Sequence, residues 1–169
     1  FSSASSLLEN FASAYPDSEY TPEVEAYLAT AYFNDRAFAR ALQSIDAIRT
    51  PTASQLAMRQ KILYELGIEC ITNGRQQEAV GYLQQAVGLR RCDAALAAQA
   101  SLWLGDALFS LGRFGDAQKA YEAFTSDRAA TDNRALGYYD LAYAKYKQKN
   151  YAGAATDFAA ALAARPGLQ

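Results

Sequence analysis

The chain has 169 residues, which fits one ordinary domain, and 51% of them are hydrophobic and 12% aromatic, which excludes an intrinsically disordered chain. A formal net charge of −2 gives no basic surface for nucleic acid or anionic lipid, and no run of 18 or more apolar residues is present to span a bilayer. Histidine is absent, which removes the commonest general base and the commonest metal ligand.

An internal repeat organises the chain. A leucine followed by a small residue, with a second small residue twelve positions later, occurs four times: Leu28-Ala29 with Ala41, Leu66-Gly67 with Ala79, Leu104-Gly105 with Ala117, and Leu141-Ala142 with Ala154. Successive units are spaced by 38, 38 and 37 residues. Such a period is typical of helical-repeat proteins. No segment alternates apolar and polar residues with period two, so we expect an all-α fold without strands.

In chain order, we expect a lone second helix over residues 1–16 and then four helical hairpins over residues 21–50, 52–90, 92–128 and 131–166. Together they make a single segment over residues 1–169 with about nine helices. Three helix starts are marked by Thr21-Pro22-Glu23, Pro51-Thr52 and Thr131-Asp132. The turns inside the hairpins are predicted at Asn34-Asp35, Asn73-Gly74, Leu111-Gly112 and Lys149-Asn150, where Gly or Asn would adopt the left-handed conformation that ends a helix.

The small residues of each unit have a packing role. Two antiparallel helices joined by a short turn approach closely where they cross, and Gly or Ala at that point permits the approach. Larger side chains would then fill the space toward the next hairpin: Phe38, Ile45, Leu83, Phe114, Tyr121, Tyr151 and Phe158.

The pattern resembles the tetratricopeptide repeat family, whose signature is Trp-x2-Leu-Gly-x2-Tyr, then Ala, an aromatic residue and Pro. The fourth unit matches it at Tyr138, Leu141-Ala142, Ala154, Phe158 and Pro166, and the resemblance covers nearly the whole chain. It implies a right-handed α-solenoid of antiparallel helix hairpins that serves as a non-catalytic scaffold.

Residues 15–20, Tyr-Pro-Asp-Ser-Glu-Tyr, are similar to a junction found in bacterial envelope repeat proteins such as the β-barrel-assembly lipoproteins and the Tol–Pal-associated proteins. This similarity points to the bacterial periplasm or cell envelope, with the cytoplasm as the alternative. The chain starts with half a repeat, and its last predicted helix has a small apolar face. Because natural solenoids usually end in a polar capping helix, we expect a part of a longer array.

No motif for catalysis or for a cofactor is present. Residues 112–115, Gly-Arg-Phe-Gly, lack the Lys-Ser/Thr of a phosphate-binding loop, and the Ser-His-Asp and Cys-His arrangements are excluded without histidine. Cys70 is interpreted as a small core residue. Cys92 would lie roughly 24 Å away at about 1.5 Å per residue, too far for a disulfide. We expect no enzymatic activity, no cofactor and no metal site.

In the resembling family the first helices line a concave groove that holds a partner. Carried over to this chain, the groove residues are Tyr27, Phe33, Tyr64, Glu65, Ile68, Trp103, Asp106, Phe109, Tyr139, Asp140, Tyr143 and Tyr146. The Lys and Asn pair with which chaperone-binding members hold a terminal carboxylate is replaced here, for example by Tyr139 and Tyr143. Aromatic rings with acids between them favour a peptide or helix of a protein partner, and a basic or amide-rich segment above others.

Two alternatives stay open from the sequence. The module could be structural, associating with copies of itself through its open solenoid ends, with the rings packed as core. It could also bind a carbohydrate or small ligand on its aromatic face. Neither nucleic acid nor membrane insertion of this segment is expected, and the sequence does not identify the partner.

Overall fold

The computed structural model describes residues 2–165. Phe1 and residues 166–169, which include Pro166 and the outer ends of the predicted ranges 1–16 and 131–166, lie outside the described residues. Within the described part the chain forms nine α-helices and no strand: α1 (Ser2–Ala14), α2 (Thr21–Asn34), α3 (Phe38–Asp46), α4 (Ala53–Thr72), α5 (Gln76–Gly88), α6 (Ala94–Ser110), α7 (Phe114–Ser126), α8 (Arg134–Lys147) and α9 (Tyr151–Ala163).

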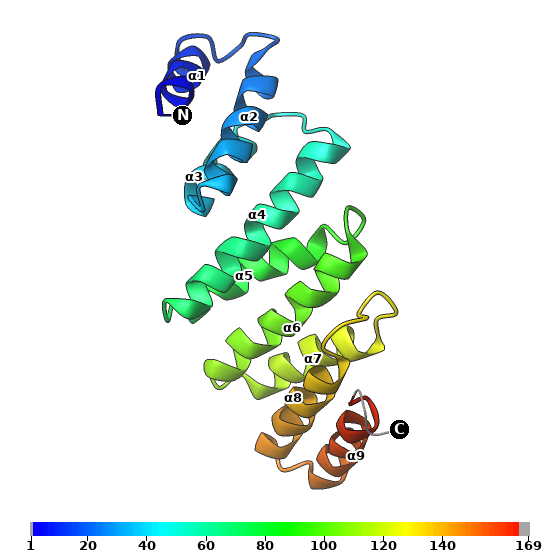
Figure 1. Ribbon diagram of the computed structural model, residues 1–169. Coiled ribbons are helices and arrows are strands. Elements are labelled where there is room, and N and C mark those ends of the chain that lie inside the picture. The colour runs from blue at the N-terminus through cyan, green and yellow to red at the C-terminus, as the bar shows by residue number, and fades with distance from the viewer. Residues whose placement is uncertain (1, 166–169) are drawn as a thin grey trace.

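The helices stack in chain order into an elongated solenoid, with the two ends of the chain at opposite ends of the molecule (Figure 1). Each helix packs on the next one in sequence, and α2, α4, α6 and α8 also contact one another in turn, so they form one continuous layer. The predicted all-α solenoid is confirmed. Over residues 2–165, no helix combines the length and the apolar character that crossing a membrane requires.

The turns inside the four hairpins share one backbone geometry. Each places a single residue in the left-handed region: Arg36 (φ 59°), Gly74 (φ 75°), Gly112 (φ 74°) and Lys149 (φ 64°). The next N–H then donates to the carbonyl five residues earlier, as Arg75 does to Cys70 at 2.8 Å. This is the bonding pattern of a Schellman motif, which satisfies carbonyl groups at a helix end.

The predicted turn chemistry is right for two hairpins and wrong for the other two. Gly74 and Gly112 take the left-handed position, as Gly does at little cost. In the first and fourth hairpins, however, the left-handed residue is Arg36 or Lys149, whereas the sequence favoured an asparagine at those turns. The left-handed residues repeat the spacing of the units, so helix packing sets their place and overrides the local preference for Asn.

The predicted helix starts also have mixed outcomes. Thr52 caps α4 as a capping box: its hydroxyl accepts from Gln55 N at 3.3 Å, and the Gln55 side chain accepts from Thr52 N at 2.9 Å. The expectation that Thr21 caps α2 is wrong. Tyr20 is the N-cap and makes no side-chain cap bond, while the Thr21 hydroxyl donates to the Tyr15 carbonyl at 2.6 Å. The Thr21 hydroxyl is therefore oriented toward the connection between α1 and α2, and the helix begins one residue earlier than predicted, at Thr21 itself.

The start of α8 differs from the prediction as well. Its N-cap is Asn133 in the left-handed conformation, not Thr131 or Asp132. Arg134 then points back across the connection and donates to the Thr125 carbonyl at 2.8 Å, at the end of α7. This side chain satisfies part of the exposed helix end and explains why α8 begins where it does.

The small residues of the repeat lie where the helices cross. All eight are buried, as predicted: Ala29, Ala41, Gly67, Ala79, Gly105, Ala117, Ala142 and Ala154. A Cβ atom added to Gly105 would lie 2.3 Å from a ring carbon of Tyr121, which shows how closely α6 and α7 approach. Tyr151 departs from the expected filling role, because its side chain is 58% exposed and its ring lies beside that of Tyr146 at 5.3 Å.

One polar side chain lies fully inside the core. Gln60 of α4 is inaccessible to solvent, and its Nε2 donates to the Ala86 carbonyl at 3.2 Å and to the Asp93 carbonyl at 3.0 Å. Ala86 lies near the end of α5, and Asp93 is the N-cap of α6. Gln60 therefore links three helices through the connection between the second and third hairpins.

Candidate functional site

Five of the predicted groove residues meet in one cavity between α6 and α8. The cavity has a volume of about 340 Å³, and its lining residues are Asp106, Phe109, Ser110, Tyr121, Tyr139, Asp140 and Tyr143. Helix α6 supplies Asp106 and Phe109, while α8 supplies Tyr139, Asp140 and Tyr143. A spacing of three or four residues places side chains on the same face of a helix, so each helix turns its acid and at least one ring toward the other.

Asp106 is held by the hairpin to which it belongs. Tyr121 of α7 donates its hydroxyl to Asp106 Oδ1 at 2.6 Å. Burial raises the pKa of the Asp106 carboxyl, and the Tyr121 hydrogen bond acts in the opposite direction. The Tyr121 ring is buried against Gly105, so the hydroxyl that fixes Asp106 is itself rigidly placed.

Asp140 lies on the facing helix without such support. Among the described residues it has no hydrogen-bond or ion-pair partner. Burial, followed by the nearby charge of Asp106, raises the pKa of Asp140 to about 7. No lysine or arginine is among the described residues that line the cavity. The site therefore holds two carboxyl groups close together without a counter-charge, an arrangement that costs stability when both are ionised.

The aromatic part of the site is a stripe along α8. Tyr139, Tyr143 and Tyr146 are 46%, 39% and 51% exposed. The Tyr139 and Tyr143 ring centroids lie 5.0 Å apart, and both rings contact Phe158 of α9, at 5.6 and 5.5 Å. The rings are thus supported on one side and open to solvent on the other, as the side chains of a binding surface are.

Two other predicted groove residues pair with each other outside the cavity. Trp103 of α6 donates its Nε1–H to the Tyr64 hydroxyl of α4 at 3.0 Å. Both rings are partly buried and pack against the main core. They join neighbouring helices of the layer and so have at least a structural role.

The rest of the predicted groove is spread along α2 and α4. Tyr27 is 60% exposed, whereas Phe33 packs on Phe38 at 5.5 Å and on the N-terminal part of the core. Glu65 and Ile68 are partly buried on α4. None of these four lines the cavity between α6 and α8.

One lining residue, Tyr121, was not among the predicted groove positions, because it was expected only as a core residue of the second helix. The Tyr121 ring is indeed part of the core, but its hydroxyl extends from α7 to the Asp106 carboxyl. The only signal in the sequence was that a tyrosine stood where phenylalanine would have filled the same space.

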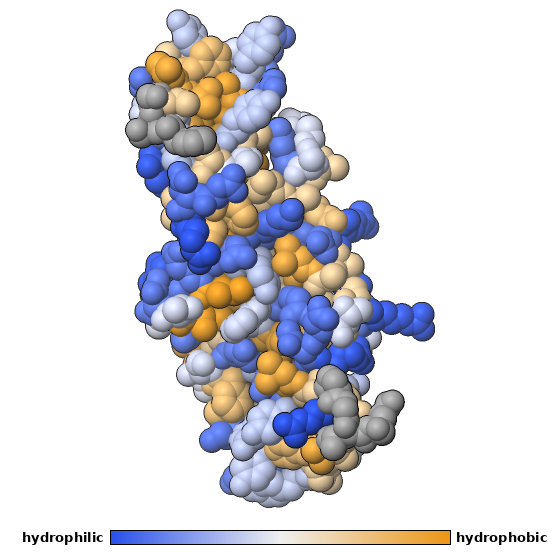
Figure 2. All heavy atoms as spheres, in the orientation of Figure 1, coloured by the Kyte–Doolittle hydropathy of each residue, from blue (hydrophilic) through white to orange (hydrophobic). Residues whose placement is uncertain are grey.

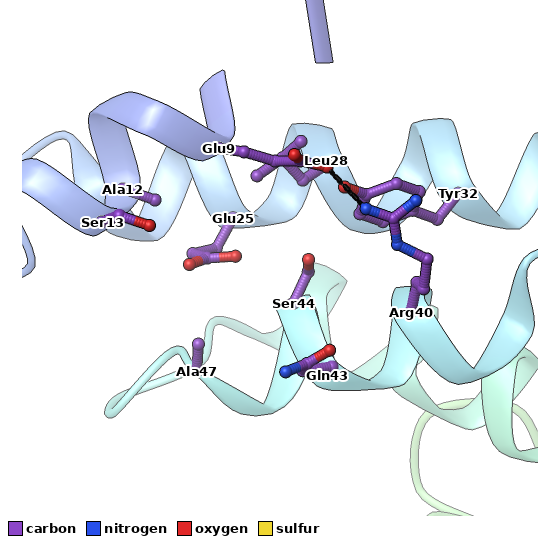
Figure 3. A pocket seen from close by; sticks show the side chains of 10 residues that line it. All are labelled: Glu9, Ala12, Ser13, Glu25, Leu28, Tyr32, Arg40, Gln43, Ser44 and Ala47. Carbon is purple, nitrogen blue, oxygen red and sulfur yellow. Dashed lines mark hydrogen bonds and ion pairs between the residues drawn. The ribbon is translucent and has the colours of Figure 1, made fainter. Parts of the chain in front are cut away.

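A second cleft, of about 370 Å³, lies between α1, α2 and α3 (Figure 3). There Glu9 of α1 accepts from the Tyr32 hydroxyl and pairs with Arg40 at 2.8 Å. The Arg40 guanidinium also lies over the Tyr32 ring, 4.4 Å from its centroid. Deeper in the cleft, burial raises the pKa of Glu25, and a hydrogen bond with Ser44 opposes that shift. The sequence did not indicate this cleft.

Figure 2 shows hydrophobic and hydrophilic residues interspersed along the visible face, without one continuous apolar band.

A stack of antiparallel helix hairpins with a period of 37 or 38 residues defines the class of helical-repeat solenoids, in which each unit packs on its neighbours. The tetratricopeptide repeat model matches residues 64–127 and 107–168, and the chain belongs to this family. Tetratricopeptide repeat proteins are typically non-catalytic modules that bind other proteins.

Solved structures agree on the fold. The crystal structure of MamA is 21% identical, with a TM-score of 0.60, and the match covers 95% of this chain and 85% of that one. YrrB, described as a TPR protein with an unusual peptide-binding site, is 17% identical with a TM-score of 0.59, covering 98% and 82%. BtubC from P. vanneervenii is 19% identical with a TM-score of 0.63, covering 99% and 72%. A comparison with curated protein sequences gave no match.

Proposed function

We propose that this chain is a non-catalytic protein–protein interaction scaffold that binds a peptide or helix segment of a partner along the layer formed by α2, α4, α6 and α8. The observation that carries the proposal is the cavity between α6 and α8, where exposed tyrosine rings stand beside two carboxyl groups. Tyrosine supplies a large contact area at little entropic cost, which is why it is frequent among binding hot spots.

The predicted groove residues divide into two groups by their surroundings. Tyr139, Tyr143 and Tyr146 are exposed and lie in one stripe, so they are the proposed anchors for the partner. Trp103 and Tyr64 are partly buried and bonded to each other, so they support the layer beneath the partner. Substitutions in the two groups should therefore have different consequences.

The test is a selection of random peptides by display against the 169-residue chain, followed by alanine variants. Tyr139→Ala should weaken the selected peptides at least tenfold and leave the melting temperature nearly unchanged, because the ring is 46% exposed. Trp103→Ala should instead lower the free energy of unfolding by about 2–3 kcal/mol, below the range for fully buried rings. Tyr20→Ala, at a ring between α1 and α2 that is 59% exposed, is the control. Peptide affinities that Tyr139→Ala leaves unchanged would contradict the proposal.

A second candidate function is self-association or continued stacking at the α8–α9 end. An apolar cavity of about 500 Å³ lies there, lined by Ala135, Leu136, Tyr139, Phe158, Ala161, Leu162 and Arg165. Leu136 and Leu162 are 47% and 59% exposed. This face would suit a copy of the chain or a further hairpin of a longer array. Sedimentation that depends on concentration, and that Leu162→Glu abolishes while Leu111→Glu does not, would support it.

Carbohydrate binding receives no support from the ring geometry. A sugar would stack on coplanar exposed rings, but Tyr139 and Tyr143 are inclined at 55° and Tyr143 and Tyr146 at 62°. A flexible peptide adapts to inclined rings more readily than a rigid sugar ring does.

The bacterial cell envelope is the proposed setting. It is supported by the junction at residues 15–20, which forms the connection between α1 and α2. Cell fractionation of the native protein would test this part of the proposal, and recovery in the cytoplasm alone would contradict it.

A further inference from the structure

The cavity between α6 and α8 combines three features that rarely occur together by chance. Its walls are the rings of Phe109, Tyr139 and Tyr143, its carboxyl groups are Asp106 and Asp140, and no basic side chain lines it. Aromatic faces attract cations through their quadrupole, and ionised carboxylates attract them through charge. Both kinds of group in the cavity therefore favour the same ligand, which is a cation.

The two lysines of α8 are engaged elsewhere. Lys145 of α8 pairs with Asp157 of α9 at 2.6 Å. Lys147 lies over the Phe114 ring, 5.9 Å from its centroid. Neither lines the cavity, so its negative charge is left for a group from outside the chain.

A metal ion fits the cavity poorly. The described residues contain no group of three or more His, Cys, Asp or Glu side chains that could hold a metal. Ca²⁺ takes about 6–8 oxygen ligands, and the carboxyl groups of Asp106 and Asp140 fall well short of that number. The volume of about 340 Å³ is near the lower end for ligand pockets, which suits one long side chain better than a large organic molecule.

We propose that this cavity receives one basic side chain of the partner segment, an arginine or a lysine, whose cationic group binds between Asp106 and Asp140 while its stem lies against the rings of Tyr139 and Tyr143. The inference rests on the proposed function and names the chemistry of the segment that is bound. This part of the layer would then bind a cation through acidic groups, whereas a site that captures a terminal carboxylate binds an anion.

Binding at this cavity depends on pH. The groups that face Asp140 are Asp106 from α6, Tyr121 from α7, and Tyr139 and Tyr143 from its own helix; α9 contributes the uncharged Phe158. None of them supplies a positive charge. Because the pKa of Asp140 is about 7, acidification from pH 8 to pH 6 places a proton on most Asp140 carboxyls and removes a charge that the ligand needs.

The probe for the test is n-butylguanidinium chloride, which copies an arginine side chain and keeps its charge over this pH range. It is titrated into the ¹⁵N-labelled 169-residue chain, and the amide shifts of α6 and α8 are followed by NMR. At pH 8 we expect saturable shifts around residues 106–110 and 139–143. At pH 6 the apparent affinity should be about tenfold lower, and 1-butanol should give no saturable shift.

Asp140→Asn is the decisive variant. It should weaken n-butylguanidinium binding at pH 8 about tenfold and abolish the difference between pH 8 and pH 6. Asp35→Asn, at an exposed carboxyl just after α2, is the matched control and should change neither. Circular dichroism establishes that both variants are folded. Equal binding to the wild type and to Asp140→Asn, or no saturable binding at pH 8, overturns the inference.

The outcome is separable from that of the proposed function. If displayed peptides bind and depend on Tyr139, but n-butylguanidinium does not bind, the scaffold stands and the basic side chain is wrong. If n-butylguanidinium binds as expected but no peptide is selected, the cavity is selective for cations and the peptide scaffold is wrong.

Discussion

Two polar regions of this solenoid differ in whether an acidic side chain has a counter-charge within the chain. In the cleft between α1, α2 and α3, Glu9 is met by Arg40 and by the Tyr32 hydroxyl (Figure 3). In the cavity between α6 and α8, Asp106 has only the Tyr121 hydroxyl, and Asp140 has no partner among the described residues. Glu9 is thus neutralised within the chain, whereas Asp140 is not.

This difference supports the proposal that the cavity between α6 and α8 is the ligand site. An ion pair at the surface changes the free energy of folding little in either direction. Two neighbouring carboxyl groups without a cation reduce stability, and strongly shifted ionisable groups in a cavity are frequent at functional sites. Four substitutions test this difference between the two regions.

Gly105→Ala should have the largest effect. The new Cβ would lie 2.3 Å from a Tyr121 ring carbon, so the ring that positions Asp106 has to move. We expect the free energy of unfolding to fall by about 2–3 kcal/mol, as for an overpacked core, measured by urea denaturation. Gly81 lies in α5, and nothing lies within 4 Å of a Cβ added there. Gly81→Ala should therefore raise the free energy of unfolding by about 0.5–1 kcal/mol. Equal effects at both glycines would contradict the close packing described for α6 and α7.

Asp140→Asn should stabilise the chain at pH 8. The folded-state pKa of Asp140, about 7, lies above its unfolded value near 4, so the unfolded chain loses this proton first as the pH rises. The wild type therefore loses stability between about pH 4 and pH 7, and the variant does not. We expect the variant to be more stable by about 1–2 kcal/mol at pH 8, with the difference vanishing toward pH 4. A variant that is less stable than the wild type at pH 8 would show that Asp140 is compensated after all.

Tyr143→Arg would make the second region resemble the first. An arginine three residues after Asp140 on the same helix would pair with it, which lowers the pKa of Asp140 and occupies the cavity. We expect chemical denaturation at pH 8 to show a free energy of unfolding that is higher by about 0.5–1 kcal/mol. Binding of n-butylguanidinium should be lost. Tyr143→Gln removes the ring without adding charge, so it should show no gain in stability.

Glu9→Gln should have the smallest effect. The Glu9 and Arg40 side chains are 38% and 61% exposed, so solvent screens their attraction and we expect a loss of about 0.5 kcal/mol or less. The loss should shrink in high salt, which thermal denaturation at two ionic strengths would measure. Arg49→Gln, in a pair that is 87% and 80% exposed, should change nothing. A loss of several kcal/mol at Glu9 would mean that this cleft carries more than a surface ion pair.

The architecture was predictable because its causes are local and repeated. Leucine and small residues at a fixed spacing mark where helices cross, and all eight small positions are buried. The details that failed depend on tertiary packing. Arg36 and Lys149 adopt the left-handed conformation because their place in the repeat requires it, and α2 begins at Thr21, with Tyr20 as its N-cap, while the Thr21 hydroxyl donates to a carbonyl of the preceding connection.

The site was predictable only as a set of positions. The sequence placed both Asp106 and Asp140 on the layer of first helices. Their spacing in sequence, however, does not tell how far they are buried or that no basic side chain lies beside them. The Tyr121 hydroxyl could not be foreseen, because the residue belongs to a second helix and its ring is core. Equally, nothing in the sequence distinguishes Trp103, bonded to Tyr64, from the exposed tyrosines of α8.

The buried side chain of Gln60 bears on how the solenoid opens. Its amide hydrogens bridge from α4 to the end of α5 and the start of α6. Separating the second hairpin from the third would break both hydrogen bonds in addition to the apolar contacts between the hairpins, and each such bond contributes about 0.5–1.5 kcal/mol to stability. Repeat arrays often fray unit by unit from their ends, but here residues 53–126 should open as one cooperative block. Native-state hydrogen exchange would then show matching protection across this block.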